Sequence, residues 1–127
     1  PHQPHAWPHA VPGVQREPEP GARCSACFLF RLTRAAEYAR EHGYRALSSV
    51  LGVSRYKDLE QVNRAARQAC QSAGITYDET NWRKGGVEEL RRAVWKELQF
   101  YAQQYCGCVF SLRARQGEKD EKKAQKN

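Results

Sequence analysis

The chain has 127 residues, enough for one domain, and a formal net charge of +7 at neutral pH, which favours a polyanionic partner. No apolar run approaches the ~18 residues of a membrane span, and no secretory signal is visible, so we expect a cytoplasmic protein with no membrane partner. Five cysteines in a reducing compartment favour metal or redox chemistry over a disulfide scaffold.

The first twenty residues differ in composition from the rest. Residues 1–20 hold all six prolines and three of the four histidines, and no apolar period runs through them. Pro-rich segments of low hydrophobicity stay unfolded, so we predict a disordered leader, with a His-rich metal tract as the alternative. The chain begins with proline and has no methionine, so we expect an N-terminally truncated protein.

Helical and extended patterns alternate after the leader. The expected elements, in chain order, are a helix from 23 to the stop signal at Gly43, a strand and loop over 44–53, a helix over 57–73, a strand over 75–77 and a helix over 87–101. This alternation predicts an α/β fold with a parallel sheet and flanking crossover helices. Two strands make an incomplete sheet, so 21–113 is expected to be the later part of a larger domain. Residues 114–127 are predicted to be a charged, disordered tail.

Four cysteines form two close pairs. Cys24 and Cys27 form a Cys-x-x-Cys at an expected helix start, where the helix dipole and free amides lower a thiol pKa. Cys106 and Cys108 follow the last predicted helix, and we expect both pairs at the loop edge of the sheet. Four thiolates suit zinc or an iron–sulfur cluster, and burial as small hydrophobes is the alternative. Cys70 is expected to be a buried structural residue.

Basic residues are in excess within the part expected to fold. Residues 21–113 carry 15 basic and 9 acidic side chains. The excess is typical of phosphate contact with a nucleic acid, and a solvated surface is the alternative. Four aromatic residues are candidates for stacking on a base, with core packing an equal alternative: Tyr56, Trp82, Tyr101 and Tyr105.

Five motifs occur in one order: "GARCSACFLFRL", "SSVLGVSRYKD", "QVN", "NWRKGG" and "FYAQQYCGCVFSLR". In this order they resemble the epoxyqueuosine reductase family of the cobalamin-independent QueH type, from about Gly21 to Arg113. The resemblance implies a Rossmann-like (HUP-like) α/β domain. It also implies an oxidoreductase that reduces the epoxide of epoxyqueuosine in tRNA to queuosine, the final step of queuosine biosynthesis.

The same resemblance implies an iron–sulfur cluster (4Fe-4S) with a further iron close by, an electron donor, and a tRNA carrying epoxyqueuosine as the partner. Carried over to matching positions, the metal-site candidates are Cys24, Cys27, Cys106 and Cys108. The candidate tRNA or substrate contacts are Arg31, Ser54, Lys57, Arg83 and Lys84. No catalytic residue and no oligomeric state are assigned.

Members of this family begin with a strand that runs into an adjacent Cys-Cys pair, where this chain has its Pro/His-rich leader. We therefore expect the first strand and its cysteine motif to be missing, and the further iron to lack ligands. Two other functions are compatible with the residues. One is a non-catalytic RNA-binding module with zinc on the same four cysteines. The other is a thiol oxidoreductase that forms a disulfide between Cys24 and Cys27.

Overall fold

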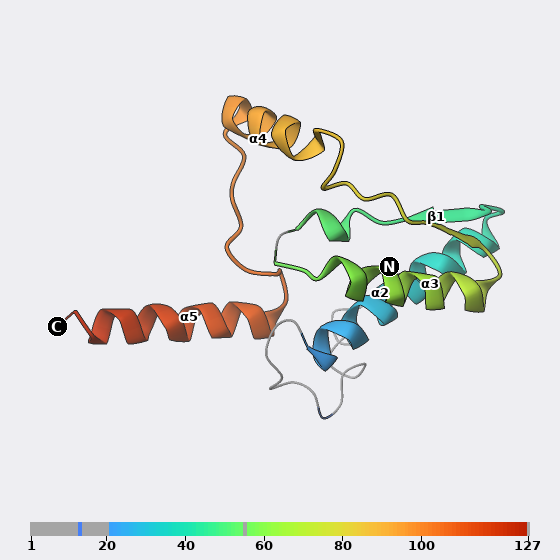
Figure 1. Cartoon of the computed structure of the whole chain (residues 1–127). Helices are drawn as coiled ribbons and strands as arrows, with labels where there is room; N and C mark the ends of the chain where they lie inside the picture. The colour runs from blue at the N-terminus through green and yellow to red at the C-terminus, as the bar shows by residue number, and fades with distance from the viewer. Residues whose placement is uncertain (1–12, 14–20, 55, 127) are drawn as a thin grey trace.

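The computed structural model describes residue 13 and residues 21–54 and 56–126 (Figure 1). Its elements are α2 (Ala22–Glu41), β1 (Ala46–Ser48), the 3-10 helix η1 (Leu51–Val53), α3 (Leu59–Ala73), β2 (Thr76–Asp78), α4 (Val87–Leu98) and α5 (Val109–Ala124). β1 and β2 pair in parallel, with Leu47 beside Tyr77. The predicted α/β class and parallel sheet are confirmed for this part of the chain. The Rossmann-like class and the missing first strand stay predictions, and the predicted leader lies outside the described residues.

α2 and α3 form the core. Phe28, Leu32 and Ala36 recur every four residues along α2 and are buried against α3. α3 contributes mostly small side chains, which let the two helices approach closely: Val62, Ala65, Ala66, Ala69, Cys70 and Ala73. Cys70 is 1% exposed, and burial raises the pKa of its thiol, so its predicted structural role is confirmed.

The N-terminal ends of α2 and α3 are tied together. Asp58 caps α3 by accepting a hydrogen bond from the Gln61 amide at 2.8 Å. The Gln61 side chain donates to the Gly21 carbonyl at 3.0 Å and to the Ser25 hydroxyl at 2.7 Å, both at the start of α2. α3 crosses back between parallel strands, so these ends lie at the carboxyl edge of the sheet, where α/β proteins place their sites.

α4 and α5 stand away from this core (Figure 1). α4 has no buried residue, and its Leu90 and Leu98 are 64% and 56% exposed. α5 continues to Ala124, through most of the segment 114–127 for which a disordered tail was expected. That expectation relied on an apolar period, whereas residues 114–124 are rich in Ala, Arg, Gln, Glu and Lys, which favour helices without one. No described helix is both long and apolar enough to cross a membrane.

The same substitution at two glycines should have effects of opposite sign. Gly117 lies inside α5, and an added Cβ would meet nothing within 4 Å, so Gly117→Ala should stabilise the helix by about 0.5–1 kcal/mol. Gly74 ends α3 with a φ of +73°, where alanine is strained, so Gly74→Ala should cost about 1 kcal/mol. Circular dichroism at 222 nm measures the helix content of Gly117→Ala, and thermal unfolding measures the stability lost in Gly74→Ala. Reduced helicity in Gly117→Ala would contradict the helical assignment of α5.

Candidate functional site

The second cysteine pair is built into the start of α5. The Cys108 sulfur accepts a hydrogen bond from the Ser111 amide at 3.3 Å and so caps the helix. The buried Ser111 hydroxyl in turn accepts a hydrogen bond from the Cys106 amide at 2.9 Å. Ser111 therefore fixes the backbone of the Cys-Gly-Cys turn from both sides. Its position three residues after Cys108 was the only signal of this role in the sequence.

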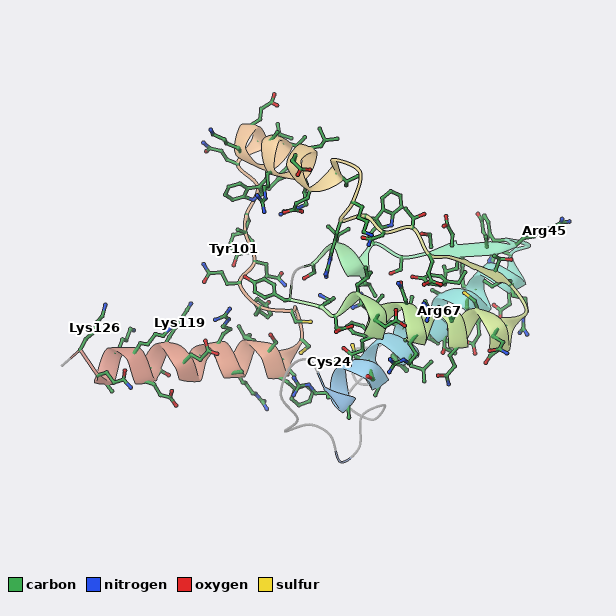
Figure 2. The ribbon with its side chains drawn as sticks, in the orientation of Figure 1. Cys24, Arg45, Arg67, Tyr101, Lys119 and Lys126 are labelled. Carbon is green, nitrogen blue, oxygen red and sulfur yellow. The ribbon has the colours of Figure 1, made fainter. Side chains whose placement is uncertain are left out.

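The first pair lies close to the second. Cys24 and Cys27 are in the first two turns of α2, and Figure 2 shows Cys24 where α2 approaches the start of α5. The Arg23 guanidinium lies 5.0 Å from the centre of the Phe110 ring and thus links the two helix starts. All five cysteines are free, so the disulfide of the thiol oxidoreductase hypothesis is not formed in this structure.

The pKa of Cys27 shows how these groups interact. Burial raises the pKa of the Cys27 thiol to about 11, although Arg31 acts to lower it. The other three thiols of the two pairs add to the increase, Cys106 and Cys108 before Cys24. The expectation that a helix start would lower the pKa is therefore wrong for Cys27, because desolvation by burial is the largest influence on its thiol. A raised thiol pKa disfavours the thiolate that attacks in thiol–disulfide exchange, and a bound metal ion would have to offset the same effect.

The four paired cysteines fit a metal or cluster in number and in donor type. Four thiolates are the ligand set of structural zinc and of a cubane iron–sulfur cluster. Within the described residues, no three His, Cys, Asp or Glu side chains already stand together as a metal-binding group. The donor set thus fits, and ligation would require the two pairs to close on one another.

A pocket of about 850 Å³ opens beside Cys106, between the loop after η1, α4 and the segment that leads to α5. Among the described residues, its lining includes four basic side chains, four aromatic ones and one acidic one, Glu88. The basic and aromatic residues are Lys57, Arg83, Arg91, Arg92, Tyr56, Trp95, Tyr101 and Tyr105. The pocket is therefore cationic, with flat apolar surfaces.

The pocket collects part of the predicted contact set. Ser54, Lys57 and Arg83 line it, and so do three of the four predicted stacking residues. Arg31 lies on α2, where it acts electrostatically on Cys27, and Lys84 is exposed in the loop before α4. Neither Arg31 nor Lys84 is among the described residues that line the pocket.

Arg83 is held by the backbone. Its guanidinium donates hydrogen bonds to the carbonyl oxygens of Gly52, Ser54 and Lys57, the last two at 2.7 Å. These carbonyls span the loop that joins η1 to α3 and forms one wall of the pocket. Arg83, which lies on the segment between β2 and α4, therefore holds that loop in place.

Three pocket residues on α4 were not predicted from the sequence. Arg91, Arg92 and Trp95 share one helical face that points into the pocket. The Glu88 carboxylate accepts hydrogen bonds from Arg91 at 2.7 Å and from Arg92 at 3.0 Å, and these hold its pKa down to about 2. The dipeptide Arg91-Arg92 four residues before Lys96 was the available signal, but the prediction followed only the apolar stripe of this helix.

The structure thus has an α/β fold with two cysteine pairs near one another, beside a cationic pocket lined by aromatic side chains. Residues 1–114 match the sequence model of the family described as Epoxyqueuosine reductase QueH, and the chain belongs to that family. The match begins at residue 1, whereas the resemblance was expected to start at residue 21.

Several relatives carry the name Epoxyqueuosine reductase QueH. The chain is 45% identical over 108 residues to the one from Acinetobacter baylyi. The matched region covers 84% of this chain and 50% of the relative. Over 108 residues it is 43% identical to the one from Histophilus somni, with 84% and 44% covered. The one from Thermotoga maritima is 36% identical over 109 residues, with 86% and 57% covered. The chain thus spans about half the length of these relatives.

Proposed function

We propose that this chain provides the thiol ligands and the tRNA pocket of an epoxyqueuosine reductase, an oxidoreductase that reduces epoxyqueuosine to queuosine in tRNA. The observation that carries the proposal is the cationic, aromatic pocket that borders Cys106. Family membership supports the reaction, and the pocket supports an RNA substrate.

The pocket suits a base presented on RNA. Lys57 and Arg92 give it positive charge for phosphate groups, which Glu88 offsets only in part. Tyr56, Tyr101 and Tyr105 provide rings on which an unstacked base can pack, the usual mode of RNA base recognition. Such a pocket would hold the modified base against the aromatic rings and the phosphate backbone of the RNA at the rim.

The reaction defines what must meet in this pocket. Reduction of an epoxide to an alkene breaks two C–O bonds, consumes two electrons and two protons, and releases water. An iron–sulfur cluster on Cys24, Cys27, Cys106 and Cys108 would relay electrons from an external donor. Cys106 is one of the four proposed cluster ligands and also lines the pocket. The electron path from a cluster to a base in the pocket would therefore be short.

A pair of matched tyrosine variants tests the pocket. Tyr101 lines the pocket and is 84% exposed, and Tyr44 is 62% exposed on the segment between α2 and β1. Tyr101→Leu should lower kcat/KM for epoxyqueuosine-tRNA by roughly tenfold or more, because one stacked base is worth ~1–3 kcal/mol. Tyr44→Leu should leave it unchanged.

The assay is nucleoside analysis of tRNA after incubation with anaerobically purified, iron-loaded chain and a chemical reductant. Formation of queuosine by the unaltered chain supports the proposal. Absence of queuosine with the chain fully loaded with iron would exclude the reductase function for this chain. Equal losses in the two tyrosine variants would exclude the pocket as the RNA site.

A further inference from the structure

We propose that one face of α5 is a docking surface for the phosphate backbone of the tRNA whose modified base enters the pocket. The proposal rests on the proposed function for the identity of the RNA. The surface, termed the basic stripe, consists of Arg115, Lys119, Lys122 and Lys123 on α5 and of Lys126 in the turn that follows the helix. At about 100° per residue the four helical side chains fall within an arc of roughly 100°. Asp120 and Glu121 fall outside that arc.

The charge of the basic stripe is largely uncompensated. Lys119, Lys122, Lys123 and Lys126 are exposed, and within residues 21–54 and 56–126 no ion pair engages their ammonium groups. Arg115 alone is paired, with Glu118 at 2.8 Å. Four free cations along one helical face form a surface that suits a polyanion.

The basic stripe begins at the candidate site. Arg115 donates a hydrogen bond to the Gln104 carbonyl at 2.9 Å, within the segment that lines the pocket. Cys108, one of the candidate ligands, caps the same helix. From this base α5 extends about 24 Å at ~1.5 Å per residue, and Figure 2 shows Lys119 and Lys126 along it. An RNA strand that leaves the pocket in this direction would meet several lysines.

Other partners suit this helix less well. Beyond Leu112, α5 has no apolar side chain larger than alanine. A membrane-surface helix needs an apolar face to enter the lipid, and a helix that docks in a protein groove needs apolar anchors. Phosphate contacts need neither. The family match ends at residue 114, so the basic stripe lies outside the part of the chain that family similarity explains.

The test compares two double variants. Each removes two positive charges, and the two variants lie at opposite ends of the molecule. The stripe variant is Lys119→Gln with Lys122→Gln. The control variant is Arg40→Gln with Arg45→Gln, two exposed residues; Figure 2 shows Arg45 at the end opposite to α5. Lysine and glutamine have similar helix propensities, so α5 should be retained, which circular dichroism verifies.

The readout is the affinity of the full chain for unmodified bulk tRNA across a salt series. In the stripe variant the slope of log K against log salt should become shallower by about 2, and affinity near ~0.1 M salt should fall roughly tenfold. The control should change less than twofold. Equal losses of tRNA affinity in both variants would mean that the net positive charge attracts tRNA without a defined contact. That result would overturn the proposal that the basic stripe is a docking surface.

Two further arms separate the alternatives. Unmodified tRNA reports backbone contact without the reaction, so failure to convert epoxyqueuosine-tRNA would refute the proposed function and leave this result intact. Vesicles containing phosphatidylserine test a lipid surface. If the stripe variant keeps its tRNA affinity but loses vesicle binding, the stripe is a membrane contact and the proposal is wrong.

Discussion

Cys27→Ser should leave the purified chain without a stable iron–sulfur cluster. Cys27 is the candidate ligand whose pKa is raised by all three other paired thiols, so it is the one most strongly coupled to the rest of the set. A serine hydroxyl stays protonated and is a poor iron ligand, whereas clusters of this type are held by four thiolates. We expect iron and acid-labile sulfide to fall from about four of each per chain to near zero. Broad absorbance near ~400 nm and turnover should be lost with them.

Cys70→Ala is the matched control for this change. It removes a thiol that is buried in the core between α2 and α3 and takes no part in the two pairs. Loss of a small side chain there should cost about 1 kcal/mol and leave the iron content unchanged. Full iron in Cys27→Ser would show that the four-cysteine ligand set is wrong. Zinc without sulfide in the unaltered chain would instead support the non-catalytic module.

The elements with an apolar period and a clear stop signal were predictable. α3 was expected over 57–73 and spans Leu59–Ala73, because alanines and valine mark one face and Gly74 supplies the left-handed end. The strand expected within 44–53 was less accurate: only Ala46–Ser48 is extended, and the chain then turns through η1. Short strands followed by a turn leave few alternating residues on which a prediction can rest.

Interactions that depend on side-chain geometry were not predictable. The apolar period over 87–101 indicated a helix, and α4 forms over Val87–Leu98, yet none of its residues is buried. The absence of such a period on α5 indicated disorder, yet charged helix formers and a cysteine cap produce a helix. The paired cysteines were identified from spacing, but the effect of burial on Cys27 depends on neighbours that come from both ends of the chain. Sequence spacing does not contain this information.

Arg83 illustrates the same limit and gives a second large expected effect. The sequence placed it with Lys84 as a contact for RNA, whereas the structure shows its guanidinium shared among three carbonyl groups of the loop after η1. Arg83→Met keeps the aliphatic stem and removes all three hydrogen bonds. Because the side chain is partly exposed, we expect a loss of about 2–3 kcal/mol in the free energy of unfolding, below the sum of three isolated charged hydrogen bonds. Chemical denaturation measures this loss.

The same variant should also open the pocket wall. Backbone amides of the loop between η1 and α3 should exchange hydrogen faster, and affinity for tRNA should fall because Ser54 and Lys57 lose their positions. Lys84→Met removes the same charge from an exposed neighbour and should affect neither property.

Arg83→Lys separates a brace from a phosphate contact. A lysine keeps the positive charge, but its compact ammonium group cannot span three carbonyls as the planar guanidinium does. If Arg83 acts as a brace, Arg83→Lys should lose nearly as much stability and tRNA affinity as Arg83→Met. Recovery of tRNA affinity in Arg83→Lys would show instead that charge alone matters at this position. The first outcome would mean that the loop of the pocket is shaped by a residue that the substrate need not touch.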